Sequence, residues 1–281
     1  MKLGISMLDF QIDKSYAVLA STQALGTQNK FLKDNYWYKY NCLGSEGLAE
    51  QLTSDLLACT NISEFAAYVP YLQCRINGKN GCVSKHFLEN GEQLATFAQI
   101  YRNVTGRELA DFIRFFPDAK SRAEYLIFFF KKYTGADITD YLYANIAVDY
   151  LIHNPDRHFD NLALILQADG VWKPAPIFDN GQGLRQNFSI TPPDMEDAEA
   201  DEALSGATLS GSFSMSLQAM EELTDKRLCI DRDALAQTLQ QYTPSIAKDY
   251  LMYAAAGRGC HFENYSLPEP IIEEETQLDI G

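Results

Sequence analysis

The sequence predicts an α+β fold in two lobes, a small antiparallel-sheet lobe with one helix followed by a larger, mainly helical lobe. The segment from residue 35 to 40 is aromatic and strand-like, whereas apolar residues at helical spacing dominate residues 92 to 151. The chain has 281 residues, of which 46% are apolar, and this suits one large domain or two small lobes that share a core. We expect the lobes at residues 1–90 and 91–262, followed by an acidic tail at 263–281.

In the first lobe, a helix is predicted after Gly44. Leucines recur at near-helical spacing from residue 48 to residue 57, and Ser45 precedes them as a plausible N-terminal cap. Two short strands are expected between residues 65 and 88. The turn Asn77-Gly78-Lys79-Asn80-Gly81 lies between them, and its glycines supply the positive φ that such turns require.

The second lobe is expected to be helical except for one insertion. Helical spacing dominates residues 92 to 151, and a β-hairpin is predicted from Leu162 to Phe178 around Asp169-Gly170. Residues 190 to 214 contain few bulky apolar side chains and predict a loop. Helices are expected again from Leu217 to about Ala256.

The charge of the chain argues against a nucleic-acid partner. It carries 38 acidic and 23 basic side chains, a net charge of −15, whereas nucleic-acid binders need clustered cations. Six of the acidic residues lie in 189–202 and six more in 263–281, neither of which contains a basic residue. The rest of the chain carries 26 acidic and 23 basic side chains, so it can still hold an anionic ligand.

The cysteines and the apolar segments predict a cytoplasmic protein with no membrane contact. None of the six cysteines forms a Cys-x-x-Cys pair, and a chain of this length does not need a disulfide framework, so we expect reduced thiols. Asp9 and Asp13 interrupt the apolar run that a signal peptide would need. The longest apolar stretch, Tyr125 to Phe130, is too short to span a bilayer.

The densest polar cluster runs from His153 to Asn161, between an apolar helix and the first strand of the hairpin. A second polar group, Phe178-Asp179-Asn180-Gly181, follows the other strand. The hairpin should therefore bring Asn161 and Asp179 to the same end. A carboxylate and an amide oxygen are hard ligands of the kind that Mg²⁺ prefers when phosphate oxygens and water complete its coordination.

Three further residues complete a possible phosphoryl-transfer site. Asp156, five residues before Asn161, could accept or orient a hydroxyl proton. Lys39 lies in the aromatic strand, and Glu46 opens the next helix, as in sites where a helix carboxylate holds a strand lysine near phosphates. Glu50, one turn later, is the alternative partner of Lys39.

The segment Gly26-Thr27-Gln28-Asn29-Lys30 could cover phosphates with its backbone N–H groups, although a plain hairpin turn has the same composition. Lys30 and Lys33 are alternatives to Lys39 as the phosphate-binding cation.

These motifs together resemble those of HipA-like serine/threonine kinases. Residues 154–161, Asn-Pro-Asp-Arg-His-Phe-Asp-Asn, look like the family's N-x-D-x-H-x-x-N catalytic loop, and Ile177-Phe178-Asp179-Asn180 looks like its magnesium-binding segment. Residues 26–30 are similar to the G-x-Q-x-K of its phosphate loop, and Ser45-Glu46 resembles the entry to its helix C. The resemblance follows the same order along residues 20 to 185.

The resemblance implies a two-lobed, protein-kinase-like fold, with ATP and Mg²⁺ and with transfer to serine or threonine of a protein. By the same resemblance, Asp156 is the catalytic base, Lys39 binds phosphates and Glu46 pairs with Lys39. Asn161 and Asp179 hold the metal ion. The residues expected at the nucleotide are Gly26, Thr27, Gln28, Lys39, His158, Asn161 and Asp179. For His158, a structural role within the loop is the alternative.

The match is to the compact, stand-alone members, because the chain begins almost directly at the phosphate loop. A toxin–antitoxin role is therefore not expected. The loop serine whose autophosphorylation switches off some relatives would fall at Gln23, so autophosphorylation remains an open option. The segment after Asp179 that contains the acidic run 194–202 could act in activation or substrate docking. Its candidate phosphosites are Thr208, Ser210, Ser212 and Ser214.

Other functions remain open from the sequence. The motif Asp-Arg-His-x-x-Asn, at residues 156–161, also occurs in phosphoinositide and related lipid kinases. The acceptor could therefore be a lipid headgroup or a small metabolite. A metal-dependent phosphoester hydrolase would use a two-metal cluster of His153, Asp156, His158, Asp160 and Asp179. A non-catalytic nucleotide-binding scaffold is the third alternative.

Overall fold

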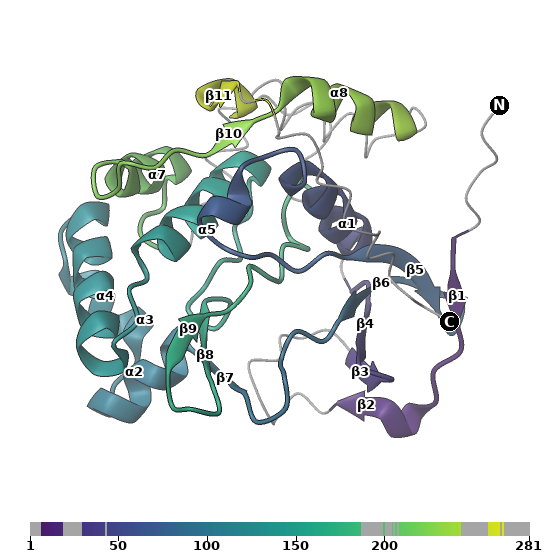
Figure 1. Cartoon of the computed structure of the whole chain (residues 1–281), viewed down its shortest axis with the longest axis horizontal. Coiled ribbons are helices and arrows are strands. Elements are labelled where there is room, and N and C mark those ends of the chain that lie inside the picture. The colour runs from purple at the N-terminus through teal and green to yellow at the C-terminus, as the bar shows by residue number, and fades with distance from the viewer. Residues whose placement is uncertain are drawn as a thin grey trace.

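The structure is a computed structural model that describes residues 7–18, 30–42, 44–186, 199, 204, 206, 208–242, 258–264 and 266. These residues form a mixed α+β fold in which a six-stranded sheet lies at one side and most of the helices lie at the other (Figure 1). No helix among them has the length and apolar character needed to cross a bilayer.

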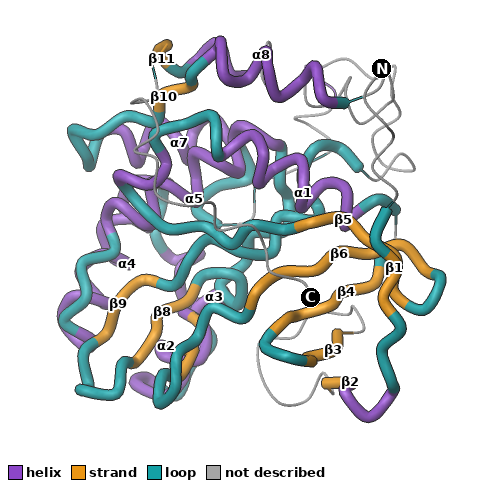
Figure 2. Tube along the Cα trace, turned by 45° about the vertical axis from the view of Figure 1, so that its right-hand side comes forward, coloured by secondary structure: helices purple, strands orange, loops and turns teal. Residues whose placement is uncertain are grey.

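The larger sheet has the strand order β1-β5-β6-β4-β3-β2, and its strands lie side by side in Figure 2. The strands are β1 (Asp9–Phe10), β2 (Ala17–Val18), β3 (Lys30–Lys33), β4 (Tyr36–Tyr40), β5 (Leu72–Ile76) and β6 (Lys79–Lys85). All neighbouring pairs are antiparallel except β1 and β5, which run parallel, so the sheet is mixed at this edge. The predicted aromatic strand is confirmed as β4, and the predicted turn joins β5 to β6.

The alternation of β4 gives the sheet two different faces. Tyr38 packs into a small apolar cluster with Phe31, Ile76 and Val83. Trp37 and Lys39 point to the opposite face, because successive side chains of a strand alternate. Lys39 is therefore a lysine on the inner face of a central strand, and it is only 7% exposed.

The predicted helix after Gly44 is α1 (Glu46–Leu57), and it packs on β5 and β6. Ser45 occupies the N-cap position, but its side chain makes no capping hydrogen bond. The helix comes unusually close to the sheet, because a Cβ on Gly47 would lie 2.4 Å from the carbonyl oxygen of Gly81 in β6. This glycine contact sets how near α1 can bring its acidic side chains to Lys39.

A second sheet contains β7 (Gln93–Thr96), β8 (Ala163–Leu166) and β9 (Trp172–Pro174), all antiparallel. The expected hairpin is confirmed as β8 and β9, but the expectation of helix from residue 92 is wrong at its start. Thr96 and Gln99 form a reciprocal capping box that begins the next helix at Phe97, and the extended residues before it pair with β8.

The helical part is arranged around one buried helix. Its helices are α2 (Phe97–Thr105), α3 (Leu109–Phe112), α4 (Ala119–Thr134), α5 (Thr139–Ile152), α7 (Phe213–Glu221) and α8 (Arg232–Gln241). Short 3₁₀ turns occur at Lys14–Tyr16, Ile62–Glu64, Ile113–Phe115 and Arg258–His261. Nearly every residue of α5 is buried, and α5 packs against α7. A helix that is apolar on all sides belongs in the core, and this one leads directly into the polar cluster that begins at His153.

The end of the described chain differs in part from the expectation. Instead of a continuous helical stretch from Leu217, a short strand, β10 (Cys229–Ile230), separates α7 from α8 and pairs in parallel with β11 (Glu263–Asn264). The part of the expected helical stretch from residue 243 to about Ala256 and most of the acidic tail lie outside the described residues.

The contact between α1 and β6 predicts that Gly47→Ala destabilises the fold. Alanine favours a helix over glycine by about 1 kcal/mol. The added methyl group would nevertheless collide with the backbone at Gly81, and overpacking of this kind costs about 1 to 3 kcal/mol. Urea unfolding should show a lower midpoint for Gly47→Ala. Ser214→Ala, at an exposed position of α7, serves as the control and should not lower it.

Candidate functional site

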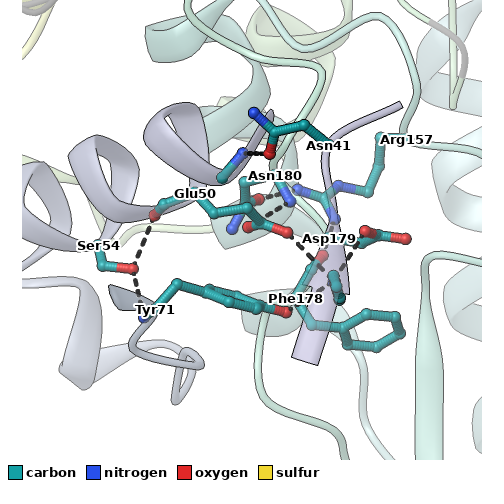
Figure 3. A network of polar contacts seen from close by, with 10 residues as sticks. Asn41, Glu50, Ser54, Tyr71, Arg157, Phe178, Asp179 and Asn180 are labelled. Carbon is teal, nitrogen blue, oxygen red and sulfur yellow. Dashed lines mark hydrogen bonds and ion pairs between the residues drawn. The ribbon is translucent and has the colours of Figure 1, made fainter. Parts of the chain in front are cut away.

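The ammonium group of Lys39 joins three acceptors from separate parts of the fold. Its Nζ lies 3.2 Å from Glu50 Oε1 in α1, 3.0 Å from Asp179 Oδ1 and 3.1 Å from the hydroxyl oxygen of Tyr71. Figure 3 shows the side chains of Glu50, Tyr71 and Asp179 converging at this point. A lysine ammonium has three N–H donors, so these acceptors match its full hydrogen-bonding capacity.

The predicted pairing of Glu46 with Lys39 is wrong, and the alternative, Glu50, is the partner. Glu46 is the first residue of α1, and its carboxylate turns back to accept hydrogen bonds from the backbone N–H groups of Cys42 and Gly44 at 3.2 and 3.1 Å. Glu50 lies one turn later and is 2% exposed. It is the carboxylate that reaches the inner face of the sheet.

The pKa values of the two acidic partners of Lys39 are shifted in opposite directions. Burial alone would raise the pKa of Asp179, but the charges of Lys39 and Lys30 and the hydrogen bond from Lys39 hold it well below its usual value. Burial raises the pKa of Glu50, although Lys39 and the N–H of Asn180 oppose this shift. Asp179 is therefore ionised at neutral pH.

Lys30 brings a second cation to the same place. In the sheet it pairs directly with Lys39 across β3 and β4, and it is 7% exposed. Burial and the neighbouring charge of Lys39 lower the pKa of Lys30, while Asp179 and Glu50 oppose this shift. Two lysines side by side make this end of the site suitable for an anion.

The polar cluster after α5 forms a tight loop around Asp156. His153 ends α5 in the left-handed region, with φ of 51°. The backbone N–H of Asp156 donates to Asn154 Oδ1 at 3.2 Å, and its carbonyl oxygen accepts from Asn161 Nδ2 at 2.8 Å. The Asp156 side chain itself is 54% exposed, so the loop holds the backbone and presents the carboxylate. Burial raises the pKa of Asp156, His158 opposes this, and Asp179 adds to it.

Arg157 connects this loop to the segment that carries Asp179. The guanidinium is 1% exposed, and its Nε donates to both carboxylate oxygens of Asp149 at 3.2 Å. Its other nitrogens donate to the carbonyl oxygen of Phe178 at 2.6 Å and to Asn180 Oδ1 at 2.5 Å. Arg157 and Asn180 are labelled in Figure 3.

Asp179 is held on both sides by these contacts. Phe178 and Asn180 bond to Arg157, and the Asn180 backbone N–H donates to Glu50 Oε2 at 3.0 Å. Asp179 has a φ of 62°, a left-handed conformation that aspartate tolerates better than most residues. The contacts of its neighbours fix this conformation and aim the carboxylate at Lys39.

The donor set fits a hard divalent cation such as Mg²⁺. Asp179 supplies an ionised carboxylate. The amide nitrogen of Asn161 donates to the Asp156 carbonyl, so its amide oxygen is the atom that can act as a ligand. Oxygen ligands of these two kinds are those that Mg²⁺ prefers.

The other residues proposed for a two-metal cluster have different partners. Asp160 Oδ1 accepts a hydrogen bond from Thr96 Oγ1 at 3.0 Å. His153 is buried with its ring against Phe213, at 5.4 Å between ring centroids. His158 Nε2 lies 3.9 Å from Asp156 Oδ1, and its Nδ1 accepts from the N–H of Asp160. Within the described chain, no three His, Cys, Asp or Glu side chains gather as a metal-binding group.

An apolar pocket opens beside the two lysines. The space between its walls is about 650 Å³, a volume that includes open solvent. Lys30 and Lys39 line it together with Trp37, Val69, Tyr71, Ser84, His86, Phe87, Leu88, Leu94 and Phe178. Trp37 Nε1 donates to His86 Nδ1 at 2.8 Å and so fixes the indole at the pocket wall. The pocket thus combines an apolar body with a cationic end.

The sequence analysis did not identify several of the residues that line the pocket. The alternation of β4 could have indicated Trp37, since it lies two residues before Lys39 on the same face. Tyr71, His86 and Phe87 carry no motif. They lie just before β5 and just after β6, and β6 comes beside Lys39 through its long-range pairing with β4. The predicted nucleotide-loop residues Gly26, Thr27 and Gln28 lie outside the described part of the chain.

Comparison with known proteins supports the fold. No protein-family model and no curated protein sequence matches the chain. Among solved structures, it is similar to the Helicobacter pylori proinflammatory kinase CtkA, with a TM-score of 0.60 and 13% identity, over 91% of this chain and 95% of that one. The HipA, HipB and operator DNA complex of Shewanella oneidensis MR-1 matches with a TM-score of 0.49 and 13% identity, over 89% of this chain and 66% of that one. The first likeness shows that the chain shares the fold of that kinase.

The buried pair of Arg157 and Asp149 predicts that Arg157→Met strongly lowers the free energy of unfolding, by an amount that depends on pH. The variant leaves a buried carboxylate without its cation, which costs about 3 to 5 kcal/mol. Burial already raises the pKa of Asp149, so the folded variant should take up a proton more readily than the unfolded chain. Its deficit relative to the natural protein should therefore shrink as the pH falls from 8 to 5.5 in urea unfolding.

Arg102→Met is the matched control, because Arg102 pairs with Glu108 at 2.6 Å on the exposed surface. Exposed pairs contribute little to stability, so its urea midpoint should stay near that of the natural protein at both pH values. Equal losses in the two variants would contradict the role assigned to Arg157.

Proposed function

We propose that this protein transfers a phosphoryl group from ATP, with Mg²⁺, to a serine or threonine hydroxyl of a protein, as HipA-like kinases do. The observation that carries the proposal is the convergence of Lys39, Glu50 and Asp179, which brings a lysine of the sheet to an ionised carboxylate next to the Asp156 loop. The fold shared with the Helicobacter kinase supports the same reaction class.

The proposal includes a two-lobed organisation. The six-stranded sheet with α1 corresponds to a smaller lobe of about residues 1–90, and the remaining described helices correspond to a larger lobe within 91–262. The pocket receives side chains from both parts, for example Trp37 and Ser84 from the sheet and Leu94 and Phe178 from the region after it. Ligand sites commonly lie at such junctions.

The pocket offers a separate environment to each part of the nucleotide. Its aromatic and aliphatic wall suits a base, which gains by stacking and by burial of apolar surface. The adjoining cations, Lys39 and Lys30, suit the phosphates. Asp179 and Asn161 are the residues that would hold Mg²⁺. The bound metal ion would neutralise phosphate charge.

Asp156 would act on the acceptor. Its half-exposed carboxylate can be approached by a hydroxyl group on another protein, and the hydrogen bonds of its backbone keep the loop in place. As the hydroxyl oxygen forms its bond to phosphorus and the bond to the leaving phosphate oxygen breaks, Asp156 would take up the hydroxyl proton. Most of the barrier lowering in such a site comes from positioning and charge neutralisation.

The reaction class is tested by incubation with γ-labelled ATP and Mg²⁺, with phosphate mapped by mass spectrometry on the protein itself and on a mixture of candidate acceptor proteins. Asp156→Asn should reduce phosphotransfer by about 10²-fold or more, because it removes the proton acceptor. ATP binding should change little, since Asp156 is not among the residues that line the pocket.

Asp169→Asn, in the distant turn before β9, is the control for loss of one surface carboxylate. Substantial phosphotransfer in Asp156→Asn would exclude this site. Label that appears on a lipid or metabolite and on no protein would retain the kinase reaction and reject the protein acceptor.

The assignment of the pocket predicts that ATP changes the fluorescence of Trp37. The chain has two tryptophans, and the second, Trp172, lies in β9. In Trp172→Phe, addition of ATP should therefore shift or quench the remaining emission, because the base would lie against the indole.

Trp37→Phe is the matched control, since it keeps an aromatic ring in the pocket and leaves only Trp172 to report. Its emission should not respond to ATP. Inorganic triphosphate, which has no base, should leave the Trp172→Phe signal nearly unchanged. A response that is equal for triphosphate and ATP would place the base elsewhere.

A further inference from the structure

The backbone of the loop that carries Asp156 accepts a hydrogen bond from a residue outside the sequence motif. The Oγ1 of Thr208 donates to the carbonyl oxygen of Arg157 at 2.5 Å. Thr208 is 5% exposed and lies 51 residues after Arg157 in the chain. A buried hydroxyl with a backbone carbonyl as its acceptor is a directed contact that valine, of the same shape, could not make.

The residues around Thr208 are fixed by the helical core. The carbonyl oxygen of the next residue, Leu209, accepts from Arg122 Nη1 in α4 at 2.7 Å, and the Leu209 side chain is 1% exposed. Ser212 caps α7, where Phe213 packs its ring against His153 at 5.4 Å. Through Arg122, the segment 208–216 therefore has an attachment to the helical core that does not involve the Asp156 loop.

Arg157 is thus held at both its side chain and its carbonyl. The guanidinium bonds to Asp149 and to the Phe178–Asn180 segment, and the carbonyl bonds to Thr208. The preceding residue is Asp156, whose own carbonyl accepts from Asn161 Nδ2. Two successive carbonyl groups, those of Asp156 and Arg157, are consequently fixed by different parts of the fold.

We propose that Thr208 is a positioning residue, through which the segment 208–216 sets the placement of Asp156 for phosphoryl transfer. The proposal rests on the function proposed above. Without the hydroxyl, the Arg157 carbonyl loses a buried donor, and the Arg157–His158 peptide is less constrained on its carbonyl side, although its N–H still donates to the Asp156 carbonyl. A displacement of about 1 Å at a reacting group can reduce a rate by about 10²-fold.

The position of Thr208 also bears on its suggested role as a phosphosite. Its hydroxyl is buried and engaged in this structure, so a kinase could reach it only after the segment leaves the Asp156 loop. The contact therefore favours a positioning role over modification in the folded state.

The test compares Thr208→Val, which keeps the shape and removes the donor, with Thr208→Ser, which keeps the donor. The matched control is Thr60→Val. Thr60 is also buried, at 4% exposed, and its hydroxyl also donates to a backbone carbonyl, that of Leu57 at 2.7 Å, but it follows α1 away from Asp156. Both valine variants should lose stability, and Thr60→Val also removes the acceptor of the Ile62 N–H at 3.3 Å.

Thr208→Val should lower kcat by about 10- to 100-fold, with the KM for ATP within twofold of the natural value. Thr208→Ser should recover most of the lost kcat, and Thr60→Val should keep it. Loss of stability in Thr208→Val with an unchanged kcat would overturn the proposal, while the proposed function would stand.

Hydrogen exchange gives a readout that does not depend on activity. In Thr208→Val, the amides of residues 154–161 should exchange faster than in the natural protein, and in Thr60→Val they should not. If the natural protein transfers no phosphate from ATP, the proposed function fails. Faster exchange would then still support the structural contact, and unchanged exchange would refute it as well.

Discussion

The whole site depends on one ammonium group that compensates one buried and one partly buried acidic side chain from two different parts of the chain. Lys39 holds Glu50 from α1 and Asp179 from the segment after β9, with Tyr71 as its third acceptor. Burial opposes the charge on each of these groups, so each is stable in the interior only with the others. The position of α1 over the sheet, set by the Gly47 contact, and the left-handed backbone at Asp179 both serve this arrangement.

Arg157 has the equivalent role in the helical part. It neutralises Asp149 on the central helix and bonds to the residues on both sides of Asp179. The two buried cations thus act on the same short segment from opposite sides: Lys39 contacts the Asp179 carboxylate, and Arg157 contacts the backbone and side chain next to it. A protein with a net charge of −15 gathers cations here, where the proposed reaction needs them.

Local features of the site could be predicted from the sequence, whereas features that depend on distant pairing could not. The turn at residues 77–78, the β8–β9 hairpin and the α1 helix follow from nearby residues, and all three are present. The carboxylate that pairs with Lys39 depends on how α1 is rotated relative to the sheet, and leucine spacing does not determine this rotation. The prediction of Glu46 was therefore wrong, and the alternative, Glu50, is the partner. Gln93–Thr96 is a strand because of a partner about 70 residues away, and its own composition contains no sign of this. Thr208 reaches Arg157 for the same kind of reason.

The pairing of β7 with β8 also constrains the order in which the chain can assemble. These strands join residues about 70 positions apart and enclose the chain from α2 to α5 together with the Asp156 loop. During synthesis, the helices between these strands can form early, but β7 and β8 cannot pair fully until Leu166 has emerged from the ribosome. The Asp156 loop lies just before that closing strand, and its partners Phe178, Asn180 and Thr208 come later still, so it acquires its final geometry late.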